Sequence, residues 1–94
     1  MKIRWTKRAI RRLASIHAYI SRDNPTAAAQ VSAAIVNAIV QLEQFPLSGR
    51  PGRIEETREL VIPRLPYVLP YRIVDDVIVI LSVIHTSRKW PEKL

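Results

Sequence analysis

The chain has 94 residues, 48% of them hydrophobic, which is enough for one domain with a modest core and excludes a disordered chain. Fifteen Lys and Arg against eight Asp and Glu give a net charge of +7, and every charged residue before Asp23 is basic. A positive charge of this size favours polyanions or an acidic protein as partners. The alternative is that the charge only keeps the protein soluble. Cysteine is absent, which excludes disulfides, thiol catalysis and Cys-bound zinc.

Metal, cofactor and membrane binding are not expected. The two histidines, His17 and His85, are joined by no carboxylate pattern of the kind that holds a metal. No apolar run approaches the length of a membrane span, and the opening residues lack the apolar stretch of a signal peptide. We therefore expect a cytoplasmic protein with a single domain, 1–94, and no membrane contact.

The first elements are a short strand and a basic helix. Residues 2–5 alternate between basic and apolar side chains, as in a half-buried strand. Thr6 then suits a helix N-cap. An apolar stripe at helical spacing follows, widened by Ile10, with the bases largely off it. The stripe consists of Ala9, Leu13, Ile16 and Ile20. This pattern predicts an amphipathic helix with a basic outer face.

A second, more apolar helix is predicted after a short connection. Asn24 is a favoured N-cap, Pro25 suits the first helical position, and Pro46 ends the helix. One face carries Ala28, Val31, Ile35, Ala38, Leu42 and Phe45, broadened by Val36, Ile39 and Val40. This breadth predicts burial on two sides. Because the connection is short, the two helices should form an antiparallel hairpin.

The second half reads as a loop and three strands. Residues 46–57 hold both glycines and predict the loop, and 58–62, 67–74 and 77–84 are the strand candidates. Asp75 and Asp76 suit a two-residue turn, and Pro70 implies a bulge or a sheet edge. The predicted fold is α+β, ordered β-α-α-β-β-β, with an antiparallel sheet covered on one face by the two-helix hairpin.

Several segments together resemble the RelE/ParE toxin superfamily over nearly the whole chain. They are IRWTKRAIRRL, DNPTAA, QLEQFPLSGRPG, TRELVIPRLPYVLPYRIVDD and IHTSRKWP, in this order. The resemblance implies a growth-inhibiting toxin neutralised by a co-expressed antitoxin that is acidic and partly disordered when free. It also implies that operator DNA is bound only through the antitoxin, whose DNA-binding part represses the operon.

The two branches of the superfamily differ in their target. RelE-like members cut mRNA on the ribosome and carry a catalytic arginine three residues before a strand tyrosine, whereas ParE-like members bind DNA gyrase. Val68 stands at the place of that arginine, and Glu59 and Val61 stand where lysines are expected. Cutting RNA requires a base, an acid and cations in fixed geometry, which these residues do not supply. The ending 84–88 resembles the I-L-H-x-x-R of ParE-like chains, so a non-enzymatic gyrase inhibitor is favoured.

Two other functions stay open. A RelE-like, ribosome-dependent mRNA endonuclease would need a rearranged site. Its candidate catalytic residues are Arg64, Arg72, His85 and Arg88. A non-toxic, basic nucleic-acid-binding module would explain the charge, but it leaves unexplained why the second helix should expose apolar surface.

The candidate partner-binding residues are mostly arginines, which bind phosphate or carboxylate in bidentate fashion. They are Arg8, Arg11, Arg12, Arg58, Arg72, Arg88 and Trp90. The alternative for each arginine is that its side chain is merely solvated at the surface. For Trp90 we favour a role in anchoring the C-terminal tail. His85 is a structural cap or a functional imidazole, and His17 a partly buried helix residue. Tyr67 and Tyr71 are expected to pack in the core.

Overall fold

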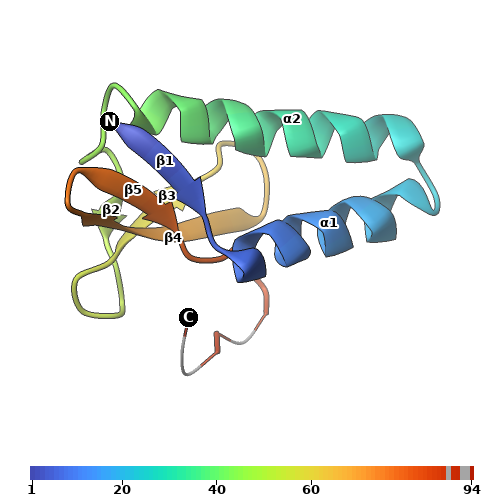
Figure 1. Cartoon of the computed structure of the whole chain (residues 1–94). Helices are drawn as coiled ribbons and strands as arrows, with labels where there is room; N and C mark the ends of the chain where they lie inside the picture. The colour runs from blue at the N-terminus through green and yellow to red at the C-terminus, as the bar shows by residue number, and fades with distance from the viewer. Residues whose placement is uncertain (89, 92–93) are drawn as a thin grey trace.

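A computed structural model describes residues 1–88, 90–91 and 94 (Figure 1). Its elements are β1 (Lys2–Trp5), α1 (Lys7–Ser21), α2 (Pro25–Leu42), β2 (Arg50–Pro51), β3 (Arg58–Val61), β4 (Tyr67–Val74), β5 (Val77–Ile80) and β6 (Ile84–His85). The predicted α+β class is confirmed. The predicted loop contains the short strand β2, and the last predicted strand is divided into β5 and β6.

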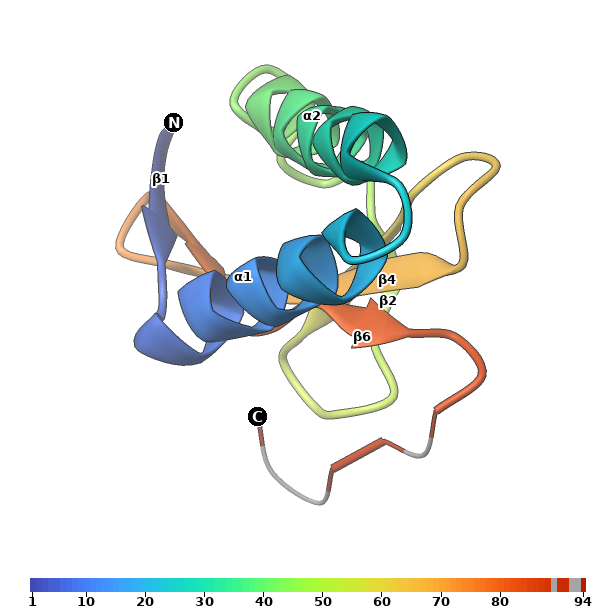
Figure 2. The same cartoon turned by 90° about the vertical axis from the view of Figure 1, so that its right-hand side faces the viewer.

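Both helices begin where local side chains satisfy their free N–H groups. The Oγ1 of Thr6 accepts a hydrogen bond from Ala9 N at 3.1 Å, and the Oδ1 of Asn24 accepts one from Ala27 N at 3.0 Å. Pro25 occupies the first turn of α2, as predicted. The two helices run antiparallel and lie side by side in Figures 1 and 2, which confirms the hairpin.

The sheet has the strand order β1-β5-β4-β3-β2, with β6 also paired to β4. All pairs are antiparallel except β1 with β5, which are parallel from Lys2↔Val77 to Trp5↔Ile80. The sheet is therefore mixed, whereas the sequence predicts an antiparallel one. A parallel pair needs a long crossover connection, and the hairpin followed by β2–β4 supplies it. Thr6 N also donates to Ile80 O at 3.1 Å, extending this pairing to the start of α1.

Two irregularities predicted for β4 are both present. Tyr71 pairs with Ile80 and Val68 with Ile84, so the two residues 69–70 face the three residues 81–83. This is a β-bulge, and Pro70, which lacks an N–H, lies opposite the extra residue. The turn after β4 has positive φ angles at Asp75 (50°) and Asp76 (61°), as a two-residue hairpin requires.

The main core lies between the helix hairpin and one face of the sheet (Figure 2). Tyr67 and Tyr71 of β4 are buried in it, which confirms their predicted packing. Their companions are Ala9, Ile35, Ile39, Leu42, Ile62, Leu69, Ile78, Ile80 and Val83. Successive strand residues point to opposite faces, so Val68, Pro70 and Arg72 lie on the outer face, away from the helices.

The second helix is buried on one side rather than two. Ile35, Ile39 and Leu42 are buried in the core, whereas Val36, Val40 and Phe45 are exposed. The exposed fraction of Phe45 is 59%. His17 is also exposed rather than partly buried, with its Nδ1 3.0 Å from the Oγ of Ser32 on α2. Apolar periodicity identifies the faces of a helix but not how many of them the rest of the chain covers.

The apolar content of α2 bears on the membrane prediction. The helix has 18 residues and is apolar enough to cross a membrane by length and composition, so the expectation that no run approaches a span is wrong. The core helix of a folded domain meets the same criterion. Ile35, Ile39 and Leu42 are buried here in the core, Ala28 is buried as well, and together they account for one face of that apolar content.

Candidate functional site

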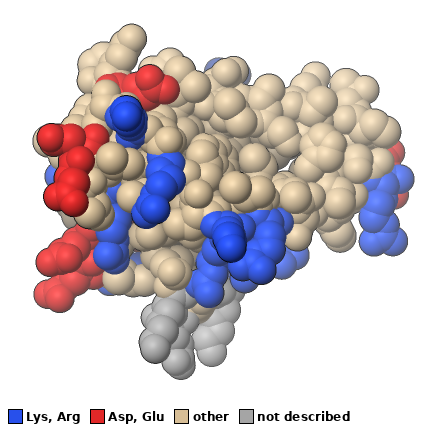
Figure 3. All heavy atoms as spheres, in the orientation of Figure 1, with Lys and Arg blue, Asp and Glu red and all other residues tan. Residues whose placement is uncertain are grey.

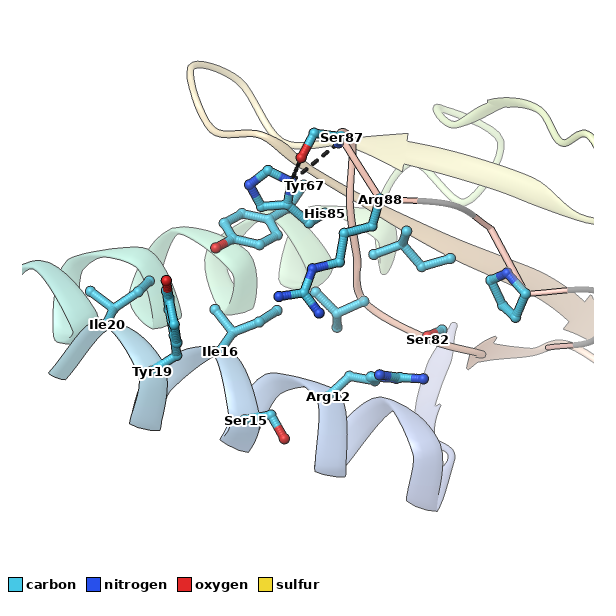
Figure 4. Close-up of a pocket in the computed structure, with 13 residues that line it drawn as sticks. Arg12, Ser15, Ile16, Tyr19, Ile20, Tyr67, Ser82, His85, Ser87 and Arg88 are labelled. Atoms are coloured by element: carbon cyan, nitrogen blue, oxygen red, sulfur yellow. Dashed lines mark hydrogen bonds between the residues drawn. The ribbon is translucent and has the colours of Figure 1, made fainter. Parts of the chain in front are cut away.

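An open groove of about 510 Å³ lies between α1 and the segment that follows β5 (Figure 4). One wall is α1, and the other is formed by residues 82–85 and by the turn after β6. Its polar side chains are Arg12, Ser15 and Tyr19 from α1, with Tyr67, Ser82, His85, Ser87 and Arg88 from the sheet side. We call this the α1–β6 groove.

One face of α1 forms the helical wall of the groove. Arg12, Ile16 and Tyr19 are separated by four and three residues, so they lie on the same side of the helix. Ile16 and Ile20 give the floor an apolar character, while Tyr19 is 70% exposed. This wall thus carries a cation at Arg12 and, two turns further along α1, the exposed aromatic ring of Tyr19.

His85 is fixed in the opposite wall by three contacts. Its Nδ1 accepts a hydrogen bond from Ser87 N at 3.1 Å and lies 2.7 Å from Ser87 Oγ. Its ring meets that of Tyr67 edge-on, with centroids 5.3 Å apart. Because Nδ1 accepts the backbone N–H, the proton of the neutral imidazole belongs on Nε2. His85 therefore caps the turn through Nδ1 and keeps Nε2–H as a donor.

The groove is cationic and lacks carboxylates. Arg12 and Arg88 both line it, and Figure 4 shows the Arg88 side chain reaching from the turn toward Ile16. Among the described residues that line the groove, none is acidic. Acid–base catalysis needs complementary groups, and His85 has no second titratable partner here apart from tyrosines. The geometry suits binding of an anion better than turnover.

The other predicted arginines do not join this site. Arg58 lies on the helix side of β3, where its Nη1 donates to Gly49 O at 2.9 Å and to Leu47 O at 3.2 Å. Arg72 lies on the outer face of β4, and its Nε is buried without a hydrogen-bond partner among the described residues. Arg64 is exposed in the turn before β4. The predicted cluster is thus divided among different surfaces.

Arg8 and Arg11 share α1 with Arg12 but do not line the groove. Figure 3 shows Lys and Arg side chains gathered over the start of α1 and the neighbouring sheet, while most Asp and Glu in view lie toward the β4–β5 turn. The basic residues of α1 thus lie near bases of the sheet, and of Arg8, Arg11 and Arg12 the last lines the groove.

Trp90 anchors the C-terminal tail, as we expected. The guanidinium carbon of Arg53 lies 3.8 Å from the centroid of its ring, a cation–π contact. Arg53 N donates in turn to the Oε2 of Glu59 at 2.8 Å, and Arg50 Nη2 lies 3.0 Å from Oε1. A chain of contacts thus ties the tail to β3 across the loop 52–57.

The outer face of the sheet carries the positions where RelE-like chains are expected to hold cations. Val61 pairs with Val68, and Glu59 with Pro70, so these side chains lie together. Val68 is only 2% exposed. The Glu59 carboxylate is almost fully buried and is paired with Arg50 and Arg53. No cation stands at any of these positions.

Residues 3–90 match the family model of the ParE toxin of the type II toxin–antitoxin system parDE. The chain belongs to the ParE toxin family. It is therefore a toxin of a type II toxin–antitoxin system.

Relatives of this ParE-family toxin carry both branch names. It is 55% identical over 99% of its length to the candidate toxin Y4kP of Sinorhizobium fredii, covering 96% of that protein. It is 31% identical to toxin RelE2 of Caulobacter vibrioides, over 89% of this chain and 93% of the relative. These names support the toxin class and do not distinguish DNA gyrase from the ribosome as the target.

Two solved structures share the fold. A chain of the chromosomal ParDE system from P. aeruginosa superposes with a TM-score of 0.83 at 28% identity, covering 93% of this chain and 97% of that one. A chain of the toxin–antitoxin complex RelBE2 from Mycobacterium tuberculosis gives 0.65 at 33% identity, covering 89% and 95%. The structural similarity is thus higher to the ParDE chain, whereas the sequence identity is higher to the RelBE2 chain.

The sequence alone identified Arg12, His85 and Arg88 but missed Ser15, Tyr19 and Ser87. Tyr19 follows Arg12 by seven residues, two turns along the same face of α1, which is a usable signal. Nothing in the sequence indicates that this face meets the turn after β6, because α2 and the five strands β2 to β6 lie between the two segments in the chain.

Proposed function

We propose that this toxin acts by binding, as an inhibitor of DNA gyrase, and that it does not cut mRNA. The observation that carries the proposal is the chemistry of the outer sheet face. Val68 is buried at the place of the expected arginine, and Glu59 puts a negative charge where a lysine is expected. At the matched positions, a scissile phosphate would find a buried apolar side chain and a carboxylate already paired with Arg50 and Arg53, so neither position offers a free cation to its developing charge.

The remaining candidate residues give little support to a rearranged nuclease. Of the four candidates, only His85 and Arg88 line the α1–β6 groove. Arg72 points from the outer face, and Arg64 lies in an exposed turn. Residues that act on one phosphate must converge within hydrogen-bond reach, and these do not.

Neutralisation by a cognate antitoxin is supported by the exposed apolar side of α2. Val36 and Val40 lie one turn apart, and Phe45 and Leu47 follow the helix, all of them exposed. We call these four residues the α2 apolar stripe. An amphipathic helix that folds on contact would cover it, and acidic residues in that partner would complement the net charge of +7. Binding of operator DNA then belongs to the antitoxin, and the pair acts in the cytoplasm.

The antitoxin's extended stretch is expected to add a strand where backbone groups remain unpaired. β1 and β2 are the two ends of the strand order, so both offer an edge. Arg58 and Arg72 lie on opposite faces of the sheet, so one acidic segment cannot follow a single surface to both. Hydrogen exchange with and without antitoxin tests this wrapping. Protection confined to residues 1–22 would contradict it.

The target is tested with two purified systems. The chain should inhibit DNA supercoiling by gyrase in a dose-dependent way, and added antitoxin should restore activity. The same concentrations should leave mRNA intact on programmed ribosomes. Cleaved transcripts with unaffected supercoiling would contradict the proposal, and loss of that cleavage in His85→Gln or Arg88→Gln would assign it to the groove.

A further inference from the structure

The α1–β6 groove combines two arginines with an exposed tyrosine, and it is separate from the α2 apolar stripe proposed for the antitoxin helix. We propose that it binds a nucleoside phosphate, with the phosphate held by Arg12 and Arg88 and the base stacked on Tyr19. This inference does not rest on the proposed target, because it concerns a ligand bound by the toxin alone.

Charge and donors favour a phosphate. Arg12 and Arg88 line the groove from opposite walls, and no acidic residue is present among the described residues that line it. Guanidinium groups form charge-assisted, often bidentate hydrogen bonds with phosphate oxygens. His85 adds a neutral N–H donor at Nε2, because Ser87 N occupies its Nδ1. Arg12, Arg88 and His85 thus offer cations and a donor to a phosphate bound in the groove.

Aromatic surface favours a base beside that phosphate. Tyr19 is 70% exposed, and Figure 4 shows its ring rising from α1 toward the side of the groove that holds Tyr67 and His85. Stacking of a nucleobase on an aromatic side chain stabilises nucleotide binding, whichever base is present. The floor formed by Ile16 and Ile20 is apolar. Inorganic phosphate alone would leave this surface unused.

The size and position of the groove also fit. Its volume of about 510 Å³ lies within the range typical of small-molecule sites. Tyr67 and its partner His85 lie on the helix side of the sheet, whereas Val68, Glu59 and Val61 lie on the outer face. The proposed ligand therefore does not occupy the surface where RelE-like chains are expected to cut RNA.

The test titrates the purified full-length chain with adenosine monophosphate, inorganic phosphate and a short acidic peptide. Calorimetry gives affinity, and NMR shifts of the His85 imidazole and the Tyr19 amide give the location. We expect the nucleotide to bind more tightly than phosphate or peptide and to shift both residues. Arg12→Gln and Arg88→Gln should each weaken binding roughly tenfold or more. Tyr19→Ser should weaken it several-fold, whereas Tyr19→Phe, which keeps the ring, should not.

Arg11→Gln is the matched control, because Arg11 is exposed on the same helix and does not line the groove. It removes the same charge and should change affinity by less than about twofold. Thermal melting checks that each variant is folded. The proposal is overturned if Arg11→Gln weakens binding as much as Arg12→Gln, if phosphate binds as well as the nucleotide, or if the acidic peptide alone occupies the groove.

Discussion

The two faces of the sheet carry their polar residues in opposite ways. On the helix side, the α1–β6 groove is open, and its arginines have no acidic partner among the residues that line it. On the outer face, the Glu59 carboxylate is buried and compensated by Arg50 and Arg53, and Val68 is buried beside it. A net charge of +7 therefore says little by itself. What matters is where each cation lies: Arg12 and Arg88 line an open groove, whereas Arg50 and Arg53 are paired with Glu59.

This difference explains how one fold can serve two kinds of toxin. The strands of the sheet fix positions on both faces equally well, and a substitution on one face leaves the other intact. On the proposed function, Val68 takes from the outer face a cation that RNA cleavage would need, while the groove on the other face is unchanged. The following predictions test that separation, beginning with the largest expected effect.

Introducing a cation at the buried position of Val68 on the outer face should destabilise the fold rather than create a nuclease activity. Val68→Arg puts an unpaired charge at a site that is 2% exposed. It should lower the free energy of unfolding by about 3 kcal/mol or more, measured by urea denaturation. Val61→Arg, at the exposed neighbouring position on the same face, is the control and should change stability little. A stable Val68→Arg variant that cuts mRNA would show that this face is a latent nuclease site.

On the helix side, stability should depend on one buried hydroxyl. Tyr71 Oη donates to Pro46 O at 2.8 Å and accepts from Gly49 N at 2.9 Å. Tyr71→Phe leaves Gly49 N–H without this acceptor and should cost about 1–3 kcal/mol in the free energy of unfolding. Tyr19→Phe removes an exposed hydroxyl and should cost almost nothing.

The same residue predicts a dependence on alkaline pH. Burial raises the pKa of Tyr71 above its ordinary value of 10.0, against smaller lowering effects of the Gly49 N–H and the Arg58 charge. A raised pKa means that the folded state holds the proton more tightly than the unfolded state. This stability is fully present below pH 10 and is lost as pH rises through the folded pKa. The loss should be shallower in Tyr71→Phe, and equal slopes would contradict this.

The α2 apolar stripe should matter for binding and not for folding. Val40→Ser removes an exposed apolar side chain from the surface proposed for the antitoxin. Antitoxin affinity should fall by about tenfold, measured by calorimetry, with little change in melting temperature. Gln30→Ser, exposed near the start of the same helix, should leave affinity unchanged. Equal effects of the two substitutions would exclude the stripe as the docking surface.

The smallest effect is expected from the basic face of α1. Replacing Arg8, Arg11 and Arg12 together by Gln should slow antitoxin association several-fold at low salt and weaken its salt dependence. Each exposed charge contributes little alone, but a clustered field steers encounter. Stopped-flow mixing measures the rate, and an unchanged rate at low salt would contradict a steering role.

The sequence predicts those features of the fold and site that depend on residues close together in the chain. It does not predict those that depend on residues far apart in the chain. Thr6 and Asn24 cap helices through contacts three residues away, so their roles can be read locally. Pro70 signals a bulge because it lacks an N–H. The parallel pairing of β1 with β5 joins residues 75 positions apart and leaves no local signal. For the same reason, it became visible only in three dimensions that Arg12 and Arg88 line one groove.

The central claim is that the toxin inhibits gyrase without cutting mRNA. Inducing the chain in cells and following DNA and protein synthesis separately tests it most directly. DNA synthesis should fall first, with transcripts intact and protein synthesis declining only later. Early loss of protein synthesis with cleaved transcripts, while DNA synthesis continues, would contradict it.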